Sequence, residues 1–270
     1  MKLCNNDNFL VLLRDTFKAC PIRIPEERIK PIIVYSQVRK KYKYIGDVVN
    51  LLNDNTKIEI EEQVSQMASL SATKTKSVDA KLGLEVMGGF LQGFGTKGAS
   101  LDFAFKGVKK ISFSFQNVSR SFVDVGKLCD LLSKRKFNLD NPVNKTFVDE
   151  SAKCIIIDSV IKSDNFSICV EESTESDFKF DISEIQKAIS SNGNNISTKS
   201  SNNLNISFQG DKSLAFAFSG FIVNCDEDGS IYYEGEPDKM NLTVEPTKTS
   251  RVIPPYLDFI ESDFGLLEFE

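Results

Sequence analysis

Hydrophobic residues follow two different spacings along the chain. Near the start the spacing is helical, and it predicts a first helix before Pro21 that is marked by Phe9, Leu10, Leu13 and Phe17. An extended run at Ile32–Tyr35 follows, and then a short helix after Gly46 and Asp47. From residue 58 onward most apolar residues alternate with polar ones, which is the pattern of strands with one buried face.

The alternating segments predict a sheet of long strands. Their apolar positions are Ile58/Ile60, Leu82/Leu84/Val86, Leu101/Phe103/Phe105, Ile111/Phe113/Phe115, 154–160, Phe166/Ile168/Val170, Phe178/Phe180, Leu204/Ile206/Phe208 and Leu214/Phe216/Phe218. Helices are predicted at 122–136 and 181–189, a loop at 190–203, and a turn at 226–229 that closes a hairpin. The predicted fold class is α+β, a long, twisted, mostly antiparallel sheet with surrounding helices.

The glycines at 93, 95 and 98 match the pattern G-x-G-x-x-G. A dinucleotide site of this kind needs a strand before the glycines and a helix after them, so that the pyrophosphate meets a helix N-terminus. The following segment, Leu101–Phe105, alternates like a strand. We therefore interpret the glycines as a connection between strands and not as a nucleotide site.

Composition argues against an enzyme. No histidine occurs among the 270 residues, which excludes Ser-His-Asp and Cys-His catalysis, a kinase H-R-D loop and zinc sites that use histidine. The six cysteines show no C-x-x-C spacing, so neither a cysteine-only zinc site nor a redox dithiol is predicted. We name no catalytic residue, no metal ligand and no cofactor.

The ends of the chain and its apolar runs bear on location. The first residues, MKLCNNDNF, contain no apolar segment typical of a signal peptide. No apolar run approaches the ~20 residues of a membrane-spanning helix. We therefore expect a cytoplasmic protein with reduced thiols.

Charge is distributed unevenly. The net charge is −5, but residues 1–53 carry +5, residues 97–136 carry +6, and residues 217–270 carry −9. A cationic body attracts an anionic partner such as a membrane surface or a nucleic acid. The alternative is that both signs of charge simply solvate the surface.

Phenylalanines and lysines are interleaved in the middle of the chain. The aromatic positions are Phe103, Phe105, Phe113 and Phe115. Earlier in the chain, a basic cluster contains Lys40, Lys41 and Lys43. The pattern is typical of a core face beside a solvated face, but also of a single-stranded nucleic-acid platform or of hairpins that place one face in lipid. Alternation leaves these interpretations open, and all seven residues are candidates for membrane contact.

The C-terminal region divides into a polar linker, 236–252, and an apolar, acidic peptide, 253–270. The apolar residues of the peptide are Tyr256, Leu257, Phe259, Ile260, Phe264, Leu266, Leu267 and Phe269. Such a peptide should dock on the body, residues 1–235, because its side chains avoid water and its charge matches the cationic regions. It is either an ordinary terminal element or a detachable plug on a cleavable tether.

The linker offers several cleavage positions. Lys248 and Arg251 suit a trypsin-like protease, Leu242 suits a hydrophobic one, and Asp238 suits a strict caspase. The residues do not choose among them. Cleavage after Arg251 removes a net charge of −5 and leaves residues 1–251 neutral, which favours binding to an anionic membrane.

Cys4 lies beside Lys2 and precedes the first apolar helix. Reversible S-acylation is chemically reasonable at such a position. The alternative is a small apolar residue near the end of a chain.

The ordered combination of these features resembles the gasdermins, and in particular the short bacterial ones. The resemblance rests on Cys4 before an apolar helix, on the segment 31–54 (PIIVYSQVRKKYKYIGDVVNLLND), on the long alternating strands and on the short terminal peptide. It covers the whole chain and implies a fold like the gasdermin N-terminal domain. The large helical C-terminal domain of animal gasdermins is missing, so inhibition would fall to residues 253–270.

The resemblance implies a pore-forming effector held inactive in the cytoplasm by its C-terminal peptide. A caspase-like or other protease would cut the tether, and the body would form a large homo-oligomeric β-barrel in the inner membrane, killing the cell in antiphage defence. It also implies palmitoylation of Cys4, membrane lipids as partners and no nucleic acid. Segments 78–115 and 154–182 are the expected membrane hairpins. The alternative is a non-enzymatic binding module whose acidic tail regulates contact with a nucleic acid or a protein.

Overall fold

The structure is a computed structural model, and it describes residues 19–38, 41–54, 56–67, 77–95, 102–105, 108–171, 180–190, 196–202 and 204–232. The predicted first helix, Cys4, Lys40, the linker and the C-terminal peptide lie outside the described residues.

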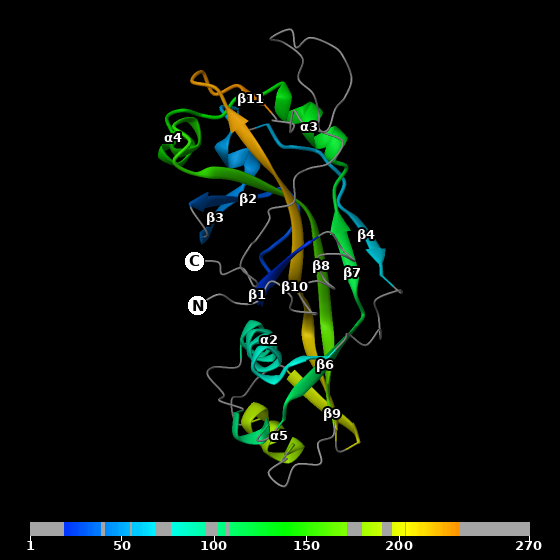
Figure 1. The fold of residues 1–270 in the computed structure, drawn as a ribbon. Coiled ribbons are helices and arrows are strands. Elements are labelled where there is room, and N and C mark those ends of the chain that lie inside the picture. Colours follow the sequence, from blue (N-terminus) through cyan, green and yellow to red (C-terminus); the bar gives the residue numbers. More distant parts are fainter. Residues whose placement is uncertain are drawn as a thin grey trace, which may run out of the picture.

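Two long antiparallel strands form the spine of the molecule (Figure 1). They are β8 (Lys153–Val170) and β10 (Asn205–Cys225), of 18 and 21 residues. Their pairing runs from Cys154 opposite Val223 at one end to Cys169 opposite Asn205 at the other. The sequence divides each strand into two predicted strands, but the structure makes each pair continuous.

Shorter strands flank the spine at three levels, which we call the upper, middle and lower tiers. The upper tier adds β2 (Ile33–Val38), β3 (Lys41–Asp47) and β11 (Ile231–Tyr232). The middle tier adds β1 (Cys20–Glu26), β4 (Gln63–Gln66) and β7 (Ser119–Phe122). The lower tier adds β5 (Val78–Asp79), β6 (Lys110–Gln116) and β9 (Ile196–Asn202). Every strand pair is antiparallel, as the sequence predicts.

Helices cover the lower and upper tiers (Figure 1). Beside the lower tier lie α2 (Ala80–Gly93), the 3-10 helix η2 (Asp102–Phe105) and α5 (Ile182–Ser190). Beside the upper tier lie the 3-10 helix η1 (Val48–Leu51), α3 (Val125–Ser133) and α4 (Pro142–Val148). Side-chain caps fix where helices begin: Asp124 Oδ1 accepts from Lys127 N at 3.0 Å and Asp79 Oδ1 from Lys81 N at 2.9 Å.

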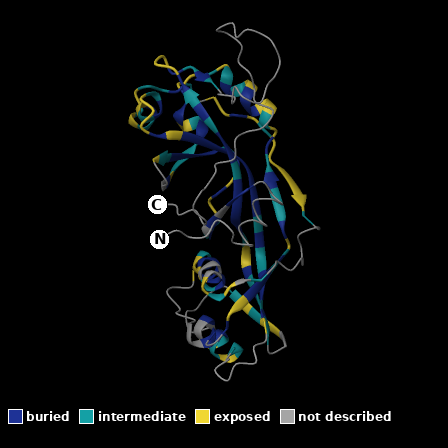
Figure 2. Ribbon diagram, viewed as in Figure 1, coloured by how far each residue is buried: buried dark blue, intermediate teal, exposed yellow. Residues whose placement is uncertain are grey.

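Each tier has its own apolar cluster. The lower cluster contains Phe90, Phe115 and Phe166, and the upper one contains Leu128, Phe137 and Phe221. A third cluster joins β1, β2 and β3 to the spine. In contrast, β4 is exposed at all four residues (Figure 2), so its pairing with β7 is what holds it.

Four sequence predictions of secondary structure are wrong. Segment 80–93 is a helix, because Met87, Phe90 and Leu91 form a buried helical face that the alternation of its leucines concealed. Segment 102–105 is a 3-10 helix, in which the Ala104 carbonyl accepts from Asp181 N at 3.0 Å. The strand predicted at Ile58/Ile60 begins only at residue 63. Part of the predicted loop 190–203 is the edge strand β9, which pairs with β10 without an apolar face.

Other predictions are confirmed. The helix predicted at 122–136 is α3, and the three residues that it buries are Leu128, Cys129 and Leu132. The helix predicted at 181–189 is α5, where Asp181 Oδ1 accepts from Glu184 N at 3.1 Å. The turn at 226–229 closes the β10–β11 hairpin with Gly229 at φ 81°.

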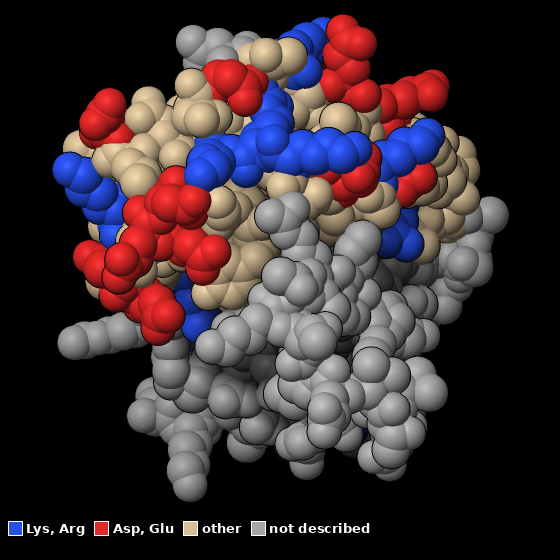
Figure 3. All heavy atoms as spheres, turned by 90° about the horizontal axis from the view of Figure 1, so that it is seen from above, with Lys and Arg blue, Asp and Glu red and all other residues tan. Residues whose placement is uncertain are grey.

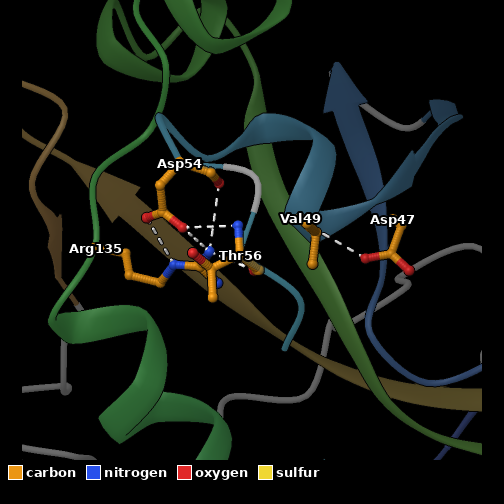
Figure 4. A network of polar contacts seen from close by, with 5 residues as sticks. All are labelled: Asp47, Val49, Asp54, Thr56 and Arg135. Carbon is orange, nitrogen blue, oxygen red and sulfur yellow. Dashed lines mark hydrogen bonds and ion pairs between the residues drawn. The ribbon is translucent and has the colours of Figure 1, made fainter. Parts of the chain in front are cut away.

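A polar network holds the segment after η1 against α3 (Figure 4). Arg135 Nε donates to Asp54 Oδ2 at 3.0 Å. Arg135 Nη2 donates to Asp54 Oδ1 and to the Thr56 carbonyl. These hydrogen bonds hold the pKa of Asp54 well below its usual range. Because Arg135 is mostly buried and makes both contacts, the pair fixes the path of the chain between two tiers.

We expect Arg135→Gln to lower stability at pH 7 and to weaken its dependence on acid. The lowered pKa of Asp54 stabilises the fold above the unfolded value of about 3.9, and this contribution is lost as the pH falls toward the folded value. Urea midpoints at pH 7 and pH 3 should therefore differ less in the variant than in the wild type. The control is Lys134→Gln, whose exposed pair with Asp130 contributes little. An equal acid dependence in Arg135→Gln and the wild type would contradict the assignment.

Candidate membrane-active surface

One face of the lower tier is entirely apolar. Its side chains come from β6, β8 and β10, and all are at most 2% exposed: Ile111, Phe113, Phe115, Phe166, Ile168, Val170, Ile206 and Phe208. The register places Phe166 opposite both Phe115 and Phe208, and Ile168 opposite both Phe113 and Ile206. We call these eight residues the apolar face.

Helices, and not a second sheet, cover the apolar face (Figure 1). Phe90 of α2 lies 4.6 Å from the Phe166 ring and 5.3 Å from the Phe115 ring, measured between centroids. Phe216 of β10 stacks on Phe115 at 4.6 Å. Phe90 is thus the main aromatic contact between α2 and the strands, and this position is one that the sequence interpretation missed. Its signal was the helical spacing of Met87, Phe90 and Leu91.

The opposite face of the same strands carries mainly hydroxyl, amide and thiol groups, with Lys110 at the start of β6 and Lys199 of β9 opposite Ser207. Its residues are Ser112, Ser114, Gln116, Asn165, Ser167, Cys169, Asn205, Ser207 and Gln209. Ser167 Oγ lies 2.7 Å from Ser207 Oγ, and Asn165 Nδ2 donates to Gln209 Oε1 at 2.6 Å. The three central strands of the lower tier, β6, β8 and β10, therefore have one apolar face and one mainly polar face.

The predicted membrane-contact residues do not form one surface. Phe105, Phe113 and Phe115 are buried in the lower cluster, so the core interpretation of their alternation is correct for this structure. Phe103 lies in η2 and Lys41 in β3, and their side chains are not described. Lys43 is exposed on β3 in the upper tier and so belongs to a different tier from the aromatic strands.

The basic character of segment 97–136 is largely neutralised near its end. Lys134, Arg135 and Lys136 pair with Asp130, Asp54 and Asp228. The Lys136 ammonium, 2.6 Å from Asp228, holds the pKa of that carboxyl below its usual range. Figure 3 shows the same interleaving of Lys and Arg with Asp and Glu on the upper face. The rings of Phe113 and Phe115 are buried, so in this structure they are not available for bases to stack on.

The described residues contain neither a helix that could span a membrane nor a cluster of metal ligands. No described helix has the length and hydropathy required to cross a bilayer. No group of three or more acidic or cysteine side chains in the described segments is arranged to hold a metal ion.

Comparison with known proteins identifies the family. The sequence profile of the Bacterial Gasdermin Family matches residues 22–230 of the 270. The chain belongs to this family. The family is pore-forming and non-enzymatic, so membership implies a pore-forming effector.

Relatives and solved structures agree with the family. Gasdermin bGSDM of Vitiosangium sp. (strain GDMCC 1.1324) is 24% identical over 273 residues, covering 100% of this chain and 99% of that protein. Gasdermin bGSDM of a Desulfuromonadales bacterium is 27% identical over 190 residues, covering 69% and 70%. The structure of a bacterial gasdermin from Bradyrhizobium tropiciagri matches with a TM-score of 0.63 at 14% identity, covering 84% of this chain and 90% of that one. The predicted gasdermin-like α+β fold is thereby confirmed.

We expect Phe90→Ala to destabilise the protein by about 3–5 kcal/mol, the usual range for removing a buried aromatic ring. The reason is that α2 loses its ring contacts with Phe115, Phe166 and Phe216. Urea denaturation measures the loss. Val64→Ala is the control, because Val64 is 63% exposed and its truncation should change stability by less than about 0.5 kcal/mol. Similar losses in both variants would show that α2 is not held by these contacts.

Proposed function

We propose that this chain is an autoinhibited pore-forming effector, released when a protease removes its C-terminal peptide. The observation that carries the proposal is the lower tier, where eight apolar residues alternate with uncharged polar ones and helices cover the apolar face. Family membership points in the same direction.

The lower tier has the residue pattern of a membrane sheet. Paired strands that alternate apolar and polar residues can place one face in lipid and the other in water once they are part of a closed barrel. The three paired segments are only about six residues long, whereas a spanning strand needs about 9–11. We therefore expect the strands to lengthen into neighbouring sequence, with 78–115 and 154–182 as the hairpins. For 78–115 this requires α2 to unfold and become strand.

The inhibitor in this proposal is the peptide 253–270 on the linker 236–252. Its apolar residues and five carboxylates suit a body with cationic segments, and its loss after Arg251 changes the net charge of the remainder from −5 to zero. Asp238, Leu242, Lys248 and Arg251 remain the candidate cleavage positions. The activating partner is a caspase-like protease or a protease of another class.

Membrane attachment in this proposal uses several weak contributions. A palmitoyl chain on Cys4 gives only marginal affinity, so basic side chains such as Lys40, Lys41 and Lys43, together with oligomerisation, must add to it. The inactive monomer is cytoplasmic and the oligomer lies in the inner membrane. Loss of the membrane barrier kills the cell, which is the outcome expected of an antiphage effector.

Dye release from liposomes of bacterial lipids tests the proposal. The protein carries an engineered protease site near Arg251, and we expect leakage only after cleavage. No leakage from a cleaved, folded body whose peptide has dissociated would overturn pore formation. Salt-sensitive binding of RNA or DNA by that body would then favour the binding module with an acidic regulatory tail.

Uncleaved tail variants are the matched controls in the same assay. Phe259→Asp and Leu267→Asp place charge on the apolar side of the peptide and should give leakage without cleavage, whereas Ser262→Asn should not. If both aspartate variants stay silent while the cleaved protein leaks, the linker and not the peptide is the inhibitory element.

We expect Cys4→Ala to reduce killing of the host cell without changing the melting temperature. The thiol of Cys4 would carry the acyl group. Without it, membrane attachment loses only the contribution of the acyl group. Cell survival after induction of the cleaved form measures the effect. Ser71→Ala is the control. Cys20→Ala is not suitable as a control, because Cys20 is buried and its replacement can change stability. Unchanged killing would show that acylation is absent or dispensable.

A further inference from the structure

Three adjacent strands of the sheet are interrupted at the same level, between the lower and middle tiers. Gln116 pairs with Asn165 and Ser119 with Lys162, so 117–118 and 163–164 fall outside the regular pairing. On the other side of β8, Gln209 pairs with Asn165 but Leu214 pairs with Ser163, so the four residues 210–213 of β10 lie opposite the single residue 164, and Gly210 pairs with Ile196 of β9. We call residues 117–118, 163–164 and 210–213 the crease. Bulges of this kind bend a strand and increase its twist.

At the crease, side-chain hydrogen bonds take the place of the missing backbone hydrogen bonds between strands. Ser163 Oγ lies 2.7 Å from the Gln116 carbonyl and 2.8 Å from the Asn165 carbonyl, and it accepts from Asn165 N at 3.1 Å. Asn117, at φ 53°, donates through Nδ2 to Asp164 Oδ1 at 3.0 Å. Asparagine tolerates this left-handed conformation better than most residues. The crease is thus a specifically bonded bend in the sheet.

The end of α2 is seated in the crease. A Cβ on Gly210 would lie 2.0 Å from the ring of Phe94, so this ring occupies the space that any side chain would need. The preceding Gly93 is equally confined, because a Cβ there would lie 2.4 Å from the Pro25 carbonyl and 2.9 Å from Leu214. Phe94 is 8% exposed and caps the helix whose Phe90 covers the apolar face.

We infer that the crease is a hinge and that Phe94 seated on Gly210 is the latch that keeps it bent. While Phe94 lies on Gly210, α2 stays on the apolar face and β10 keeps its extra residues at 210–213. Uncovering the face requires α2 to leave, and α2 cannot leave while its last ring is held. Release of Phe94 therefore precedes exposure of the apolar face. This inference rests on the proposed pore-forming function.

A reversible cross-link tests the latch. In the variant Phe94→Cys/Gly210→Cys the ring is gone, and a Cβ at residue 210 lies in the space that the ring occupied, 2.5 Å from its Cδ1 position, so we expect the two thiols to meet there as a disulfide. We expect the cleaved, oxidised variant to release no dye from liposomes and the same sample to release dye after reduction. Ile231→Cys, opposite the native Cys225 in the β10–β11 pair, is the control for a cross-link in the upper tier and should leak in both states. Wild type treated with the same oxidant controls for its native thiols.

Two outcomes of this experiment separate the latch from the function. Equal leakage from the oxidised and reduced variant would overturn the latch and leave pore formation intact. Absence of leakage from every cleaved sample, wild type included, would overturn the proposed function and the latch with it.

A second pair of variants decides the question if the double-cysteine protein is inactive in both states. Gly210→Ala puts a methyl group where the Phe94 ring lies, so the ring must leave its seat. We expect a severalfold shorter delay before leakage after cleavage, and faster amide hydrogen exchange in residues 87–94. Gly88→Ala is the matched control, because nothing lies within 4 Å of its Cβ and the substitution strengthens the helix. Leakage and exchange in Gly210→Ala no faster than in the wild type would overturn the latch.

Discussion

Backbone hydrogen bonds between β8 and β10 connect all three tiers of the sheet. Each flanking strand except β3, β4 and β5 pairs directly with one of these two, and those three pair with strands that do. The tiers therefore cannot change their mutual positions unless the spine bends. Of three shifts in register along the spine, the one near Asp158 divides the middle tier from the upper. There the buried Asp158 accepts from Ser219 Oγ at 3.1 Å, while burial raises the pKa of its carboxyl.

The lower tier shows how a sheet with one fully apolar face is covered in the folded protein. Alternation gives each strand an apolar side, and an aqueous protein must cover that side. Here the cover is α2, η2 and α5, which are short elements attached through apolar side chains such as Phe90, Phe105 and Ile185. A helix can leave a sheet without breaking the sheet's own ladder, whereas a second sheet sharing strands with it could not. Strands that alternate apolar and polar residues can therefore occur in one chain with helices that cover the apolar side.

Sequence patterns predicted the strands that bury one face and failed where a second pattern overlapped the first. The alternation that marks Phe166, Ile168 and Phe208 does lie in strands, whereas alternation of the same length in segments 80–93 and 102–105 lies in helices. In segment 80–93 the leucines alternate while Met87, Phe90 and Leu91 follow a helical spacing, and only the contacts with β6, β8 and β10 decide between them. The strand β9 could not be predicted, because its residues after Ile196 are all polar and show no alternation, and its place is set by pairing with β10. The position of the crease depends on register, which no single segment specifies.

The first and one of the last described strands are neighbours, and this affects how the chain folds during synthesis. Cys20 of β1 pairs with Phe218 of β10, and the spine itself joins residues 69 apart at its upper end (Cys154 and Val223) and 36 apart at its lower end (Cys169 and Asn205). During synthesis, β2 and β6 therefore emerge from the ribosome before their partner β8, and β1 emerges before its partner β10. The sheet closes only after β10 has been made, so most of the body must fold as one late, largely post-translational event.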